Sequence, residues 1–214
     1  MASEQSEQVR RAYDKIAAAY GEHFADELRH KPQDRQLLRR FAFSLPQQGR
    51  VLDLGCGPGH IAAYLAGEGS RAVCGIDLSP AMVQEARRRY PEIAFDAGDM
   101  LALPLADASL TGIVAMYAIV NLERAALPAA FAEMHRVLQP GGRLLLSFHI
   151  GDETVHREEL FGEAISLDFH FLQPQEVAKQ LGQAGFAIEE IVEREPYPEV
   201  EYQSRRAYVF AVKL

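Results

Sequence analysis

The chain has 214 residues, of which 48% are hydrophobic and 24% are charged, proportions typical of an ordinary folded domain. Its net charge of −8 argues against a nucleic-acid partner, because phosphate backbones are bound by concentrated basic surfaces. No apolar run is long enough to cross a bilayer, and residues 1–8 lack the apolar core of a signal peptide, so we expect no membrane span and a cytoplasmic location. Cys56 and Cys74 fall at or beside predicted buried strands, so neither a disulfide nor a metal site is expected.

Two helices are expected at the start of the chain. Residues from about 7 to 30 place their apolar side chains on one stripe, which indicates an amphipathic helix. A second helix is expected from about 33 to 43, after which Pro46 and Gly49 interrupt the pattern.

From residue 50 onwards, strand-like and helix-like segments alternate. Strands are expected at 50–54, 72–76, 93–96, 111–116, 143–149, 186–193 and 203–212, and helices at 60–67, 80–90, 124–138 and 174–184. This alternation predicts an α/β fold with a doubly wound, mostly parallel sheet and helices on both faces. The last two strands leave no room for a helix between them, so the final strand is expected to be antiparallel.

The most informative segment is a glycine-rich turn between the first predicted strand and the helix behind it. Glycines at 55, 57 and 59 let the backbone turn sharply and let a ligand approach, and an acidic residue, Asp77, ends the next strand. A dinucleotide fingerprint would need glycine where His60 stands. A carboxylate at Asp53 would also repel a pyrophosphate, whereas it could pair with a cationic or amino-bearing ligand.

The segment Leu52-Asp53-Leu54-Gly55-Cys56-Gly57-Pro58-Gly59 closely resembles motif I of the class I S-adenosylmethionine-dependent methyltransferases. Two further elements resemble the same family: Arg136-Val137-Leu138-Gln139-Pro140-Gly141-Gly142, and Tyr13-Asp14-Lys15-Ile16-Ala17-Ala18-Ala19-Tyr20. The resemblance implies a Rossmann-like, seven-stranded sheet with its last strand antiparallel, in a single domain over 1–214. Within it, residues 1–45 would form a helical cover, 50–150 the cofactor-binding core, 151–175 an insertion over the substrate, and 176–214 the terminal helix and hairpin.

The resemblance also implies S-adenosyl-L-methionine as cofactor, with S-adenosyl-L-homocysteine as product. Asp77 would hold the ribose hydroxyls, although it could instead cap the following helix, for which Ser79 is better placed. Asp99 would hold the adenine amino group, unless it is an ordinary turn residue. The remaining cofactor-binding candidates come from the N-terminal cover, the glycine turn and the strand ends. They are Tyr20 in the cover, and Asp53, Gly55, Cys56, Gly57, Leu78, Met82, Met100 and Met116 in the turn and at the strand ends.

Two histidines are candidates for a general base. His149 ends a buried strand, and His170 lies between aromatic residues before a helix; either could instead be a structural histidine. Where many small-molecule members of the family carry a histidine after the fourth strand, this chain has Asn121, which cannot act as a base.

We therefore expect a methyltransferase that acts on a small-molecule acceptor and is most similar to the quinone-biosynthesis group, as a monomer or homodimer. A non-catalytic S-adenosylmethionine-binding protein remains an alternative. A nicotinamide-dependent oxidoreductase is disfavoured by Asp53, His60 and the terminal hairpin.

Overall fold

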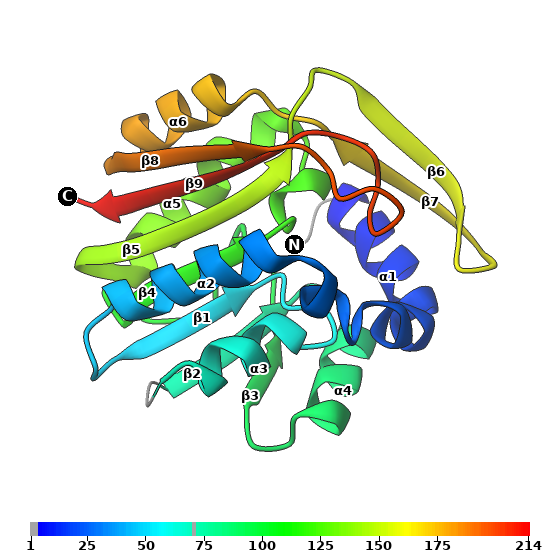
Figure 1. Ribbon diagram of the computed structural model, residues 1–214, viewed down its shortest axis with the longest axis horizontal. Coiled ribbons are helices and arrows are strands. Elements are labelled where there is room, and N and C mark those ends of the chain that lie inside the picture. Colours follow the sequence, from blue (N-terminus) through cyan, green and yellow to red (C-terminus); the bar gives the residue numbers. More distant parts are fainter. Residues whose placement is uncertain (1–3, 70–71) are drawn as a thin grey trace.

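The computed structural model describes residues 4–69 and 72–214 and is built around one seven-stranded sheet. Its strand order is β3-β2-β1-β4-β5-β9-β8 (Figure 1). The strands are β1 (Arg50–Leu54), β2 (Ala72–Asp77), β3 (Ala94–Ala97), β4 (Leu110–Met116), β5 (Leu138–His149), β8 (Phe186–Arg194) and β9 (Arg206–Lys213). The first five pair in parallel, and β9 pairs antiparallel with both β5 and β8. The predicted α/β fold with a reversed last strand is confirmed.

Helices cover both faces of the sheet. Leu144 and Leu146 of β5 join the cluster that includes α5 (Leu127–Val137) and α6 (Pro174–Gln183), while Leu145 joins that of α2 (Pro32–Ser44) and α3 (His60–Gly67) on the opposite face. Successive side chains of a strand point to opposite faces, so a strand buried on both sides is apolar throughout.

The N-terminal segment differs from the single helix predicted over residues 7–30. Helix α1 spans Glu4–Phe24, and a separate 3₁₀ turn, η1, spans Glu27–His30. Helix α2 begins at Pro32, which disfavours helical backbone at Lys31, and Lys31 is indeed non-helical, with φ −120° and ψ 73°. The predicted helix over 124–138 is also shorter, because residues Arg124–Ala126 form a 3₁₀ turn, η3, ahead of α5.

A second, two-stranded sheet was not predicted. Strands β6 (Thr154–Leu160) and β7 (Glu163–His170) form an antiparallel hairpin within the segment 151–175. Most of β6 is exposed, so its sequence lacks the alternation that marks a half-buried strand. The hairpin projects beyond the main sheet beside α1 (Figure 1).

The remaining helix of the core, α4 (Pro80–Arg89), packs against α1. Asp14 of α1 accepts hydrogen bonds from Ser79 Oγ at 2.6 Å and from the Ala81 N–H at 3.2 Å. This joins the N-terminal helix to the first turn of α4. None of the helices in the described ranges is both long and apolar enough to span a bilayer.

Candidate active site

A cavity of about 810 Å³ lies at the carboxyl ends of the parallel strands. Its walls come from α1 and η1, the strand ends, the β6–β7 hairpin and the loop 195–205 that joins β8 to β9. Parallel α/β sheets bind ligands at this edge. All but one of the predicted site residues line it: Tyr20, Asp53, Gly55, Cys56, Gly57, Asp77, Leu78, Met82, Asp99, Met100, Met116 and His149.

The glycine turn needs its glycines for two different reasons. Gly55 has φ +69°, and a Cβ there would lie 2.5 Å from the Cβ of Ala118, so a larger residue would collide. Gly57 has φ +49°, and a Cβ there would meet only the ring of Tyr20, at 3.9 Å. The second position therefore keeps the backbone open to the cavity.

Asp53 has a structural role. Its Oδ2 accepts from the Ala62 N–H at 2.9 Å, so the carboxylate caps the first turn of α3. Burial raises its pKa to about 7. Asp53 still lines the cavity, and contact with a ligand stays a prediction.

Asp77 holds the turn in place. Its Oδ2 accepts from the Gly57 N–H and its Oδ1 from the Ser79 N–H, each at 2.8 Å. Burial raises its pKa to about 6. Ser79, as expected, caps α4 by accepting from the Met82 N–H at 3.1 Å. A carboxylate oxygen can accept more than one hydrogen bond, so Asp77 retains acceptor capacity for a ligand.

The residues after β3 carry unused hydrogen-bonding groups. Asp99 Oδ1 accepts from the Leu101 N–H at 2.9 Å. This hydrogen bond is typical of an ordinary turn residue, the alternative to adenine binding. Within the described residues, Asp99 Oδ2 and the Met100 N–H have no partner. An acceptor and a donor on consecutive residues match the edge of an adenine ring.

The N-terminal cover closes over the turn through aromatic contacts. The ring centroid of Tyr20 lies 4.3 Å from that of Phe24 and 6.0 Å from that of Phe161 at the tip of the β6–β7 hairpin. Tyr13 donates to Asn121 Oδ1 at 2.8 Å, and Asn121 Nδ2 donates to the Asp168 carbonyl at 2.7 Å. Asn121 thus joins α1 and β7. It has a structural role at the position after the fourth strand where many small-molecule methyltransferases carry a histidine.

His149 ends β5, which β4 separates from β1 in the sheet, and it lines the cavity. Its ring stacks on Phe171 with centroids 5.0 Å apart and lies 5.1 Å from Tyr117 on the β4 side. Its Nδ1 lies 2.7 Å from Ser204 Oγ. Burial, with a smaller effect from the nearby Arg206 guanidinium, lowers the pKa of His149 to about 4, so the imidazole is neutral at neutral pH.

The structure does not bring His170 to the cavity. His170 ends β7, its Nδ1 lies 2.9 Å from Thr154 Oγ1, and it is not among the cavity-lining residues. No geometric observation supports a catalytic role for it.

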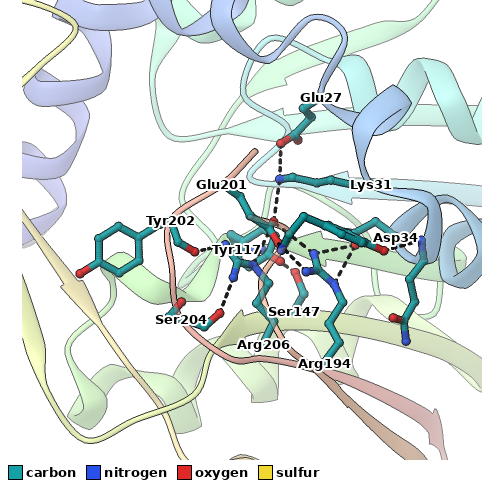
Figure 2. A network of polar contacts seen from close by, with 12 residues as sticks. Glu27, Lys31, Asp34, Tyr117, Ser147, Arg194, Glu201, Tyr202, Ser204 and Arg206 are labelled. Atoms are coloured by element: carbon teal, nitrogen blue, oxygen red, sulfur yellow. Dashed lines mark hydrogen bonds and ion pairs between the residues drawn. The ribbon is translucent and has the colours of Figure 1, made fainter. Parts of the chain in front are cut away.

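A buried ion network was missed by the sequence analysis. Glu201 accepts from Arg194 and from the Tyr197 N–H, and lies 3.1 Å from Arg206 Nε and 3.5 Å from Lys31 Nζ (Figure 2). Asp34 binds Arg194 on the other side, at 2.8 Å. Arg194 and Arg206 face each other in the β8–β9 register, and two paired arginines require buried counter-charges, but the sequence alone does not show this register.

Known proteins with similar sequences agree with this geometry. Residues 51–142 match a family described as a methyltransferase domain. The chain's resemblance to the class I S-adenosylmethionine-dependent methyltransferases is confirmed. A demethylmenaquinone methyltransferase from Beutenbergia cavernae is 43% identical over 53% of this chain and 46% of its own length.

Two further similarities extend over more of the chain. A ubiquinone/menaquinone biosynthesis C-methyltransferase from Rubrivivax gelatinosus is 34% identical over 66% of this chain and 56% of its own length. The chain therefore spans about half the length of these curated relatives. A crystal structure of an S-adenosylmethionine-dependent methyltransferase from Methanosarcina mazei superposes with a TM-score of 0.71 over 79% of this chain and 94% of that one, at 19% identity. That likeness is one of fold.

Proposed function

We propose that the protein transfers a methyl group from S-adenosylmethionine to a small-molecule acceptor. The observation that carries this proposal is the hydrogen bond between the glycine turn and the Asp77 carboxylate. Asp77 Oδ2 accepts from the Gly57 N–H at 2.8 Å, and both residues line one cavity. The residues present fit the cofactor. Gly57 leaves its backbone open, Asp77 can accept from ribose hydroxyls, and the unused groups of Asp99 and Met100 match adenine.

When bound, the cofactor would supply an activated methyl group, so the protein mainly has to align a nucleophile and exclude water. We assign the acceptor to the part of the cavity that contains His149, Phe171 and Tyr202. A neutral His149 can take a proton from an acceptor that arrives protonated. The activities for which the two quinone-biosynthesis relatives are named support an aromatic or other small-molecule acceptor.

The alternative is a protein that binds the cofactor without catalysis. Such a protein would need the same glycine turn, the same Asp77 and the same adenine-binding groups at Asp99 and Met100 as the enzyme. The enzyme is favoured by His149, because it lines the same cavity with a neutral ring that can accept a proton from an acceptor.

Calorimetry tests the cofactor assignment. We expect S-adenosylhomocysteine to bind and NAD not to bind. Asp77→Asn should weaken S-adenosylhomocysteine binding by about 1.5–3 kcal/mol, the range for hydrogen bonds to a charged group. In the wild type, affinity should fall below about pH 6, because protonation of Asp77 removes acceptor capacity.

Asp96→Asn is a matched control, since Asp96 lies on the neighbouring strand, is exposed and, among the residues that the structure describes, pairs with Arg87. It should leave cofactor affinity unchanged. NAD binding without a response to S-adenosylhomocysteine would overturn the assignment, and unchanged affinity in Asp77→Asn would reduce Asp77 to a structural residue of the turn.

A further inference from the structure

His60 lines the cavity, and only one of its two ring nitrogens has a hydrogen-bond partner in the part of the chain that the structure describes. It is the first residue of α3, directly behind the glycine turn. Its Nε2 lies 2.6 Å from Oε1 of Glu27, in η1. Its Nδ1 is buried and has no hydrogen-bond partner within the described part of the chain. Buried polar atoms are normally paired, so an unpaired one on a residue that lines a cavity points to a ligand contact.

The Glu27 pair determines which nitrogen carries the proton. Although burial opposes it, hydrogen bonds and charges from His60 and Lys31 hold the pKa of Glu27 at about 2. An ionised carboxylate only accepts hydrogen bonds, so Nε2 is the donor. In a neutral ring the other nitrogen, Nδ1, is then an acceptor and is suited to an amino group.

The strand order shows which part of the cofactor comes near this acceptor. Asp99 and Met100 follow β3, Asp77 ends β2, and His60 follows the turn after β1. These three strands are neighbours in the order β3-β2-β1. A cofactor with adenine at β3 and ribose at β2 therefore extends its amino-acid end towards β1 and His60.

We propose that His60 Nδ1 binds the α-amino group of the cofactor, while Glu27 holds the imidazole in position from the N-terminal cover. This inference rests on the proposed function, since it takes S-adenosylmethionine as the cofactor. It adds a contact to the amino-acid end and couples that contact to the placement of η1.

The test uses His60→Gln and three ligands that differ only at the amino-acid end. The glutamine amide can occupy roughly the place of Nε2 and still donate to Glu27, but it leaves nothing at the place of Nδ1. We expect S-adenosylhomocysteine to bind about tenfold or more weakly to the variant. Methylthioadenosine, which has the adenosine but no amino acid, should bind both proteins equally. S-adenosylhomocysteine without its α-amino group should also bind both equally.

His156→Gln is the matched control. His156 pairs with Asp168 at the same 2.6 Å, but this pair is half exposed on the hairpin and does not line the cavity. All three ligands should bind this variant as they bind the wild type.

Equal losses for S-adenosylhomocysteine and methylthioadenosine in His60→Gln would mean a structural role and would overturn the inference. Full affinity for S-adenosylhomocysteine would overturn it too, and a loss for the deamino analogue would assign His60 to the carboxylate instead. Failure of the wild type to bind either adenosine ligand would overturn the proposed function itself, which is a distinguishable result.

Discussion

The ring of His149 is held on several sides while remaining uncharged. Phe171 stacks on it, Tyr117 lies on the β4 side, and Ser204 is bonded to Nδ1. Tyr117 itself has φ +54°, a left-handed conformation that costs about 1–2 kcal/mol for a residue with a side chain. Its N–H donates to Ser147 Oγ at 3.0 Å, which helps to offset that cost.

We predict that His149→Gln lowers turnover by about 10²–10⁴-fold, the usual contribution of a general base. S-adenosylhomocysteine affinity should remain that of the wild type, because His149 lies away from the turn. The acceptor for this assay can be found by incubating the protein with labelled cofactor and a metabolite extract.

The same histidine sets the pH dependence. With its pKa lowered to about 4, the imidazole is neutral above that pH and charged below it. At saturating cofactor, the rate should therefore not fall near pH 6.5, where a free imidazole protonates, but only towards pH 4. A wild-type rate in His149→Gln would exclude the base, and an acid limb centred near pH 6.5 would show that burial does not lower the pKa.

That the residues around the glycine turn lie together could be predicted, because it follows from local order. Gly55, Gly57 and Asp77 lie at strand ends, and parallel strands bring their carboxyl ends to one edge. The contact of Lys31 with Glu201 could not be predicted, because these two residues are far apart in the sequence. Nothing in residue spacing indicates such a contact.

At the scale of elements, the core strands were predictable because they are apolar and bounded by turns. The helix over 60–67 was predicted with the bounds that α3 has. The β6–β7 hairpin was not predicted. Because β6 is largely exposed, its sequence carries no burial pattern, and the strand is defined by its hydrogen-bonded pairing with β7. The stripe on α1 was correctly read as helical, but periodicity did not reveal its end at Phe24.

The hairpin is attached at its tip. Phe161 and Gly162 form the turn with φ +54° and +80°, and the Phe161 ring lies 5.0 Å from that of His23 and 6.0 Å from that of Tyr20. Positive φ disfavours phenylalanine, so the turn is held by contact with α1 rather than by its own preference.

We predict that Phe161→Asn separates these two effects. Asn-Gly is a favoured sequence for such a turn, so the hairpin itself should form well, but the aromatic contact with α1 is lost. Hydrogen exchange of the amides over 154–170 should accelerate relative to the wild type. Phe43→Ala, at a residue that is 59% exposed on α2, should leave that exchange unchanged. Unaltered exchange in Phe161→Asn would show that other contacts hold the hairpin.

At the scale of the whole molecule, Glu201 connects the two ends of the chain. Lys31 lies in the N-terminal cover, whereas Arg194 and Arg206 flank the loop between β8 and β9. The carboxylate is 4% exposed, and although burial opposes ionisation, the cations around it lower its pKa. Removing one partner of a buried ion pair leaves an uncompensated charge.

Glu201→Gln should therefore lower the free energy of unfolding by about 3–5 kcal/mol. Urea denaturation measures this change. Glu195→Gln removes a charge from the same loop, but Glu195 is 78% exposed and pairs with Arg205 at the surface, so the change should stay within about 1 kcal/mol. Similar losses in both variants would contradict a special role for the buried carboxylate.

The position of β9 has a consequence for how the protein is made. β9 leaves the ribosome after both β5 and β8, yet it lies between them in the sheet. Until it emerges, the long apolar edge of β5 is an unpaired strand edge on a nascent chain, of the kind that recruits other strands. Arg206, at the start of β9, also supplies a wall of the cavity. The cavity is therefore complete only after β9 has inserted, and the nascent chain most needs chaperones in the interval before that.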